Sequence, residues 1–206
     1  MSRKKIILVG AGGHAKSCID VIEKHGEYEI AGLVGLPEQI NTEHSGYKVI
    51  GSDKDLGQLY KDFPYAIITV GQIKTANIRK DLYEKLKNFG FNIPSIISKS
   101  AQVSSRVIIE EGSIVMQDVI INSGVSVGKN CIINTRALIE HDVKVGDHTH
   151  ISTGVIVNGG ASIGHRTFIG SGSIIRDGIK VGDDCLVGMG MTVLANLENE
   201  KKLAGE

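Results

Sequence analysis

Three histidines, His141, His148 and His150, lie within one ten-residue stretch of a chain that has seven in total. Glu140 and Asp142 flank His141, so a carboxylate can orient the imidazole and stabilise its protonated form. Histidine in such a setting serves as a general base near neutral pH. Metal binding is the competing interpretation, but His148 and His150 are separated by one residue on an expected turn, and no cysteine lies near them. The pattern favours acid–base chemistry without a metal ion.

A second chemical motif lies near the N-terminus, where Gly10, Gly12 and Gly13 precede His14. An aliphatic run at residues 4–9 comes before these glycines, and a helical pattern over residues 15–25 follows them. Glycines between a strand and a helix let backbone amides approach a phosphate at the helix N-terminus. The spacing is not that of the dinucleotide motif, so a purely structural turn is an open alternative.

The elements that must position the histidines belong to a repeat of six residues. An aliphatic side chain returns at every sixth position without a break, which fits neither an α-helix nor a simple strand. Hexad periodicity is typical of a parallel β-helix, in which each short strand points one side chain into a narrow core. The aliphatic positions are Val103, Ile109, Val115, Ile121, Val127, Ile133, Ile139, Val145, Ile151, Val157, Ile163, Ile169, Ile175, Val181, Val187 and Val193.

Three hexads close one triangular coil, so residues about eighteen apart should lie over one another. His141 then has Ser123 below it and Gly159 above it, and Asp142 lies beneath Gly160. The missing side chain of Gly159 would leave the imidazole uncovered and expose backbone amides beside it. The alternative is that these glycines form only a corner turn and that His141 is a solvated surface residue.

The first hundred residues follow a different plan. Strand patterns at residues 29–34, 46–51 and 65–70 alternate with helical patterns at residues 53–61 and 75–88, which predicts a small parallel sheet. Gln72 follows the third of these strands at the carboxyl edge, where such sheets bind ligands, and is predicted to line the cleft. The sequence therefore predicts two domains, residues 1–98 and residues 99–206.

Composition excludes several classes of partner. The formal charge is zero, and no basic run suggests a nucleic acid. No apolar run has the length of a membrane span or the plan of a signal peptide, so no membrane partner is expected. The three cysteines lack metal-like spacing and read as core thiols of a cytoplasmic protein.

On these motifs, nearly the whole chain resembles the left-handed β-helix acyltransferases. The closest resemblance is to the family of sialic acid O-acetyltransferases and nucleotide-amino-sugar N-acetyltransferases. It implies a Rossmann-like α/β domain followed by a left-handed parallel β-helix, a homotrimer, and direct acetyl transfer from acetyl-CoA without metal. The implied acceptor is a nucleotide-activated sugar of the 4-amino-4,6-dideoxy type in bacterial glycan synthesis. O-acetylation of a sialic-acid-like sugar is the alternative, and a non-catalytic binding solenoid is a third reading.

The resemblance also implies roles for individual residues. His141 is the expected base, with Asp142 or Glu140 orienting it, and Asn134 completes the catalytic group. A backbone amide near Gly159 is the expected oxyanion donor. The implied coenzyme A contacts are His150, Gly159, Gly170, Ser171, Gly188 and Met189, and the implied nucleotide-sugar contacts are Gly10, Gly12, Gly13, His14 and Gln72.

The sequence departs from the family pattern at three places. Asp142 stands where close relatives often have glutamate. Gly35 and Leu36 stand where many relatives have an acidic pair, so the base of the nucleotide is left open. The sequence ends at Glu206, whereas relatives commonly continue into a Gly-x-Pro-Ala-Lys ending.

Overall fold

The computed structural model describes residues 3–204 and divides into two units. The first unit contains Met1–Gly71 and Asn77–Ile96, and the second contains Gln72–Ala76 and Ile97–Glu206. The segment Gln72–Ala76, which the sequence analysis assigned to the N-terminal domain, thus groups with the second unit.

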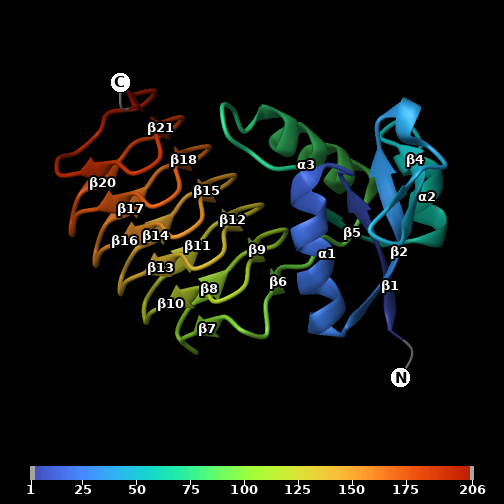
Figure 1. Cartoon of the computed structure of the whole chain (residues 1–206), viewed down its shortest axis with the longest axis horizontal. Helices are drawn as coiled ribbons and strands as arrows, with labels where there is room; N and C mark the ends of the chain where they lie inside the picture. The colour runs from blue at the N-terminus through green and yellow to red at the C-terminus, as the bar shows by residue number, and fades with distance from the viewer. Residues whose placement is uncertain (1–2, 205–206) are drawn as a thin grey trace. The chain divides into compact units, whose positions relative to one another are not determined.

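The first unit is an α/β domain built on one sheet with the strand order β3-β4-β2-β1-β5 (Figure 1). The central strands β4, β2, β1 and β5 are parallel, and β3 joins β4 as an antiparallel hairpin. Its elements are β1 (Lys4–Val9), α1 (Gly13–His25), β2 (Tyr28–Gly35), η1 (Pro37–Gln39), β3 (Glu43–His44), β4 (Tyr47–Ser52), α2 (Leu56–Asp62), β5 (Tyr65–Ile68) and α3 (Asn77–Phe89).

Helix α1 begins directly after the glycine loop and ends at a glycine. Gly12 is its N-cap, and Gly26 closes it in the left-handed conformation at φ 82°. The buried face of α1 consists of Ala15, Cys18, Ile19, Val21 and Ile22. The loop from β1 into this helix is therefore held at both sides by packed elements.

The second unit is a left-handed parallel β-helix, as the hexad period and the resemblance predicted (Figure 1). Each strand pairs with the strand one coil later, for example Ile121 with Ile139, so one coil takes 139 − 121 = 18 residues. We name its three faces after the strands of one coil. The β12 face contains β6 (Ile96–Ile97), β9 (Ile114–Val115), β12 (Ile132–Ile133), β15 (His150–Ile151), β18 (Phe168–Ile169), β21 (Leu186–Val187) and β23 (Lys202–Leu203).

The other two faces complete the triangular prism. The β13 face contains β7 (Gln102–Val103), β10 (Ile120–Ile121), β13 (Leu138–Ile139), β16 (Ile156–Val157), β19 (Ile174–Ile175) and β22 (Thr192–Val193). The β14 face contains β8 (Ile108–Ile109), β11 (Ser126–Val127), β14 (Lys144–Val145), β17 (Ser162–Ile163) and β20 (Lys180–Val181).

The second residue of each two-residue strand points into the prism. Ile133, Ile139 and Val157 are fully buried there, and small residues such as Ala137 and Cys131 fill the corners. Buried hydroxyls bond to backbone, as when Thr149 Oγ1 donates to the Gly164 carbonyl at 2.7 Å. Within residues 3–204, no helix is long and apolar enough to span a bilayer.

Candidate active site

His141 lies at the corner between the β13 and β14 faces. Its Nδ1–H donates to Oδ2 of Asp142 at 3.0 Å, and both side chains are about two-thirds exposed or more, at 66% and 72%. Because the carboxylate holds Nδ1, the other ring nitrogen, Nε2, carries the lone pair. That nitrogen can accept a proton from a bound molecule.

Glycines above and below make room for this pair. A Cβ on Gly159 would lie 2.6 Å from Nε2 of His141 and 2.7 Å from its Cε1. A Cβ on Gly124 would collide with Oδ1 of Asp142. The coil register agrees with the predicted stacking, because Gly160 donates its N–H to the His141 carbonyl at 2.9 Å. The absence of a side chain at position 159 is therefore what uncovers the imidazole.

Asp142 has a left-handed backbone conformation, whereas the residues at the same position in the neighbouring coils are glycines. Its φ is 60°, and the residues stacked in line with it, Gly124, Gly160 and Gly178, have φ values of 79°, 68° and 66°. Non-glycine residues at other corners of the prism have the same conformation, for example Asp118 and Arg166 at φ 57°. The left-handed backbone is therefore the ordinary corner conformation of this β-helix, and the contact with His141 is what distinguishes Asp142.

The structure separates the two acids beside His141. Glu140 accepts a hydrogen bond from Nδ2 of Asn122 on Oε2 at 2.9 Å, whereas Asp142 bonds the ring. Of the two orienting groups that the sequence left open, Asp142 is the one in contact with the imidazole.

A groove of about 620 Å³ extends from His141 toward the later coils. Its far wall includes Arg176 and Asp177, which stand two coils above Glu140 and His141. Neither residue was predicted from the sequence, although the eighteen-residue register places both of them here. The groove is lined by Glu140, His141, Asn158, Gly159, Ile174, Arg176, Asp177, Thr192 and Leu194.

His150 and Asn134 form a second polar group. His150 lies on the β12 face, and Asn134 lies at the corner between the β12 and β13 faces. His150 donates Nδ1–H to the Gln72 carbonyl at 2.6 Å, so its Nε2 accepts from Nδ2 of Asn134 at 3.3 Å. Asn134 is oriented for this because its Oδ1 accepts the Thr135 N–H at 2.8 Å. His150 is only 6% exposed and packs edge-on against Phe168. Neither His150 nor Asn134 lines the His141 groove.

The predicted coenzyme A contacts are divided in the same way. Gly159 lines the groove, whereas Gly170, Ser171, Gly188 and Met189 lie at the corner of Asn134, between the β12 and β13 faces. Met189 is 78% exposed there, and Ser171 Oγ bonds Ser152 Oγ at 2.9 Å. Within a single chain, the predicted catalytic and cofactor residues thus fall on two separate corners.

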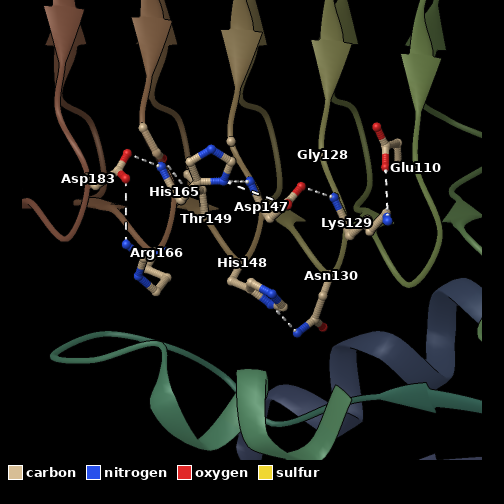
Figure 2. Close-up of polar contacts among 12 residues, drawn as sticks. Glu110, Gly128, Lys129, Asn130, Asp147, His148, Thr149, His165, Arg166 and Asp183 are labelled. Atoms are coloured by element: carbon tan, nitrogen blue, oxygen red, sulfur yellow. Dashed lines mark hydrogen bonds and ion pairs between the residues drawn. The ribbon is translucent and has the colours of Figure 1, made fainter. Parts of the chain in front are cut away.

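His148 belongs to a third corner, between the β14 and β12 faces, with a polar ladder of its own (Figure 2). Its Nδ1 lies 3.0 Å from Nδ2 of Asn130. Beside it, Asp147 accepts the Lys129 N–H at 2.9 Å, and its own N–H donates to Nδ1 of His165 at 2.9 Å (Figure 2). Among residues 3–204, no group of three His, Cys, Asp or Glu side chains is arranged to hold a metal ion.

The first unit has a pocket of about 450 Å³ at the carboxyl ends of its strands. The glycine loop, residues 10–14, forms one wall. Gly10 must be glycine, because at φ 128° a Cβ would lie 2.7 Å from the Val70 backbone nitrogen. Gly12 and Gly13 face open space, as expected for backbone that receives a ligand.

Gln72, which the sequence placed in this cleft, does not line the pocket. It is 3% exposed and groups with the β-helix, where its carbonyl holds His150. The pocket instead receives Leu36, Gln39, Asp53, Ile78 and Leu82. These residues come from three separate segments, and no local motif marks any of them.

Comparison with known proteins gives matches to both units. The family model described as the PglD N-terminal domain matches residues 5–86, and the hexapeptide repeat of succinyl-transferase matches residues 160–195. PerB from Caulobacter crescentus, solved with CoA and GDP-perosamine, is 31% identical with a TM-score of 0.92. The alignment covers 99% of this chain and 95% of PerB.

Two further solved structures extend the comparison. A histidine-to-asparagine mutant of perosamine N-acetyltransferase from C. crescentus, also with CoA and GDP-perosamine, is 30% identical with a TM-score of 0.92, covering 99% of this chain and 95% of that one. The acetyltransferase domain of PglB from Neisseria gonorrhoeae, with acetyl coenzyme A, is 28% identical with a TM-score of 0.90. In that case the alignment covers 99% of this chain and 97% of the domain.

Proposed function

The chain belongs to the left-handed β-helix acyltransferases with a PglD-type N-terminal domain, and we propose that it acetylates the amino group of a nucleotide-linked amino sugar from acetyl-CoA. The sugar is of the 4-amino-4,6-dideoxy type, and the product is a precursor of a bacterial glycan. The observation that carries the proposal is the imidazole of His141, held through Nδ1 by Asp142, with Nε2 under the bare backbone of Gly159.

The reaction is a direct transfer in this proposal. The unprotonated amine of the sugar attacks the thioester carbonyl, its proton passes to Nε2 of His141, and the carbon–sulfur bond then breaks. The proton on Nε2 goes to the departing sulfur, so the products are the acetamido sugar and CoA with a free thiol. Asp142 keeps Nδ1 protonated and stabilises the imidazolium between these steps.

Gly159 supplies the group that stabilises the intermediate. Its N–H has no hydrogen-bond acceptor among residues 3–204, while the neighbouring Gly160 N–H is occupied by the His141 carbonyl. A free backbone N–H beside the base is a suitable donor to the negative oxygen of the tetrahedral intermediate, and such a donor contributes roughly 10²–10³ in turnover.

The separation of the two polar corners supports a homotrimer. His141 lies at one corner of the prism and Asn134 at the next, so one acetyl group can meet both only if they come from different chains. The β13 face between these corners presents the aliphatic side chains Ile120 and Ile174, 37% and 39% exposed. The β14 face has one exposed isoleucine, Ile108 in its first coil, and presents Lys144 and Lys180 in later coils. We therefore assign the β13 face to the contact between chains, with acetyl-CoA in the groove formed there.

Mixing two inactive variants tests the shared site. His141→Ala and Asn134→Ala chains, refolded together in equal amounts, join an intact His141 corner to an intact Asn134 corner at roughly one interface in four. We expect about a quarter of wild-type activity from the mixture and almost none from either variant alone. If the mixture is as inactive as its components, the two residues do not act across an interface.

Turnover of acetyl-CoA with amino sugars linked to GDP, UDP or dTDP tests the function itself. We expect release of the CoA thiol together with a product that has gained one acetyl group as an amide, which alkali does not remove. An alkali-labile ester would instead indicate O-acetylation. The His141→Ala variant is the control for uncatalysed transfer.

We place the reaction in the cytoplasm, whose reducing conditions suit three free, buried cysteines.

A further inference from the structure

The pocket of the first unit contains one carboxylate, that of Asp53, among its described lining residues. Strand β4 ends beside strand β2, with Ser52 paired to Gly35, so Asp53 follows at the same edge as Leu36. This edge is where parallel sheets of this kind bind nucleotides. The carboxylate therefore lies in the part of the pocket beyond the glycine loop, away from the phosphate position at the N-terminus of α1.

The turn that carries Asp53 is fixed by its neighbours. Oδ2 of Asp55 accepts both the N–H and the hydroxyl of Ser52, each at 2.8 Å. These bonds to the backbone and side chain of Ser52 lower the pKa of the Asp55 carboxyl, so it is ionised at neutral pH. After the neighbouring strand β2, Gln39 Oε1 accepts the Leu36 N–H at 2.8 Å. Asp53 and Leu36 are thus presented on preorganised backbone.

Asp53 forms an ion pair through one carboxylate oxygen, and its other oxygen is available to a ligand. Its Oδ2 accepts from Nζ of Lys85 at 2.6 Å, and the two side chains are 44% and 41% exposed. Oδ1 has no hydrogen-bond partner among residues 3–204. Lys85 does not itself line the pocket, so the pair presents to it a carboxylate that is held in place by the ammonium and still has acceptor capacity.

Aliphatic side chains line the same pocket as Asp53. Leu36 and Ile78 line it yet are 59% and 61% exposed, and Leu82 lines it from the same helix as Ile78. Exposed aliphatic side chains in a pocket with one carboxylate suit a flat ring that is apolar on its faces and polar on its edge. A nucleobase has this character.

The order of donors and acceptors selects among the bases. The edge of guanine presents O6 as an acceptor, followed by two donors, N1–H and the 2-amino group. The Asp53 carboxylate can accept from both donors, and such charge-assisted pairs are strong. Uracil and thymine present acceptor, donor, acceptor, so one carbonyl oxygen would face the carboxylate. Adenine and cytosine each place an acceptor ring nitrogen next to their amino group, so a carboxylate could accept from only one donor.

We propose that Asp53, supported by Lys85, selects guanine as the base of the acceptor nucleotide. The inference rests on the proposed function for the presence of a nucleotide, and it adds the base and the residue that reads it. PerB, the relative solved with GDP-perosamine, is a protein with a guanine nucleotide bound.

Calorimetric titration of the full chain with nucleoside diphosphates, without acetyl-CoA, tests the inference apart from catalysis. We expect GDP to bind about 10- to 100-fold more tightly than UDP, and IDP, which lacks the 2-amino group, to fall between them. Asp53→Asn should lower GDP affinity by about 10- to 100-fold. It should also raise affinity for xanthosine diphosphate, because the new amide can donate to the C2 carbonyl of xanthine. Asp81→Asn, an exposed site on α3 outside the pocket, is the matched charge control.

Each outcome decides a separate point. If GDP and UDP bind equally, or Asp53→Asn leaves GDP affinity unchanged, Asp53 only pairs with Lys85 at the surface and the inference fails. Equal losses for GDP and UDP would assign Asp53 to the ribose instead and overturn the guanine assignment. Selective GDP binding without any acetylation of GDP-linked amino sugars would sustain the inference and remove the proposed function. Acetylation with no base preference would sustain the proposed function and overturn the inference.

Discussion

The glycine above the imidazole offers the most direct test of the proposed base. In Gly159→Ala, the new Cβ would stand 2.6 Å from Nε2 of His141. Unstrained contacts of this kind need roughly 3.5 Å, so the ring must move by about 1 Å. Position 159 is not in the left-handed region, and the His141 side chain is 66% exposed, so the backbone accepts alanine and the ring can swing into solvent.

The expected loss follows from that displacement. A misplacement of about 1 Å in a reacting group can cost roughly 10²-fold in turnover. We expect kcat to fall by about that factor in a thiol-release assay at saturating substrates, while the melting temperature stays near that of wild type. Removing the base altogether sets the upper limit, roughly 10²–10⁴.

Gly178→Ala provides the matched control for a methyl group in the same corner. Gly178 has φ 66° and no atom near its added Cβ, so alanine there strains the backbone without touching His141. We expect it to destabilise the β-helix by about 1 kcal/mol and to leave kcat unchanged. If Gly159→Ala keeps normal turnover, or if both variants lose activity and stability together, the position of His141 under Gly159 does not control catalysis.

Other variants test the remaining assignments. His141→Ala should lower kcat by roughly 10²–10⁴ with the fold and trimer intact, Asp142→Asn should lower it less, and His148→Ala should matter least. A metal site would make His148 and His150 as important as His141 and would make activity sensitive to EDTA, so kcat is measured with and without the chelator. Gly13→Leu should raise the KM of the nucleotide sugar and leave that of acetyl-CoA unchanged, because position 13 lines the N-terminal pocket and faces open space; equal rises in both constants would show that the pocket is misassigned. Burial raises the pKa of the Cys18 thiol from 9.0 to about 12, with Arg79 offsetting part of the effect. The stability from keeping this thiol protonated is therefore full below about pH 9 and is lost as the pH rises toward 12. Urea titrations should show wild type losing more stability than Cys18→Ala between pH 8 and 10, values chosen to bracket the pKa of the unfolded thiol. Parallel losses would contradict the assignment.

The β-helix could be predicted from the sequence because its contacts are periodic. A residue in one coil meets residues one coil away, so the hexad spacing alone determines the register. That register placed Gly159 over His141, and the structure has the same stacking, with Gly160 bonded to the His141 carbonyl. The strand, glycine loop and helix at the N-terminus could also be predicted from the sequence, since Gly10 and Gly12 act within one short segment.

The sequence could not show which residues share a site across the coil. Asn134 and His150 lie seven and nine residues from His141 along the chain, but such a step crosses a corner of the prism. They therefore face away from the His141 groove. The choice between Asp142 and Glu140 likewise depended on side-chain contacts, because Asn122, one coil below, binds Glu140.

Only the tertiary structure decided the make-up of the N-terminal pocket. Leu36, Asp53, Ile78 and Leu82 carry no motif and are far apart in the chain. They meet because β2 and β4 are parallel neighbours whose carboxyl ends reach the same edge, and because α3 packs beside them. Gln72 follows a strand as the pattern required, yet it groups with the β-helix, because its segment is placed by contacts with that unit. Local sequence determined the elements here, and long-range packing determined which of their ends came together.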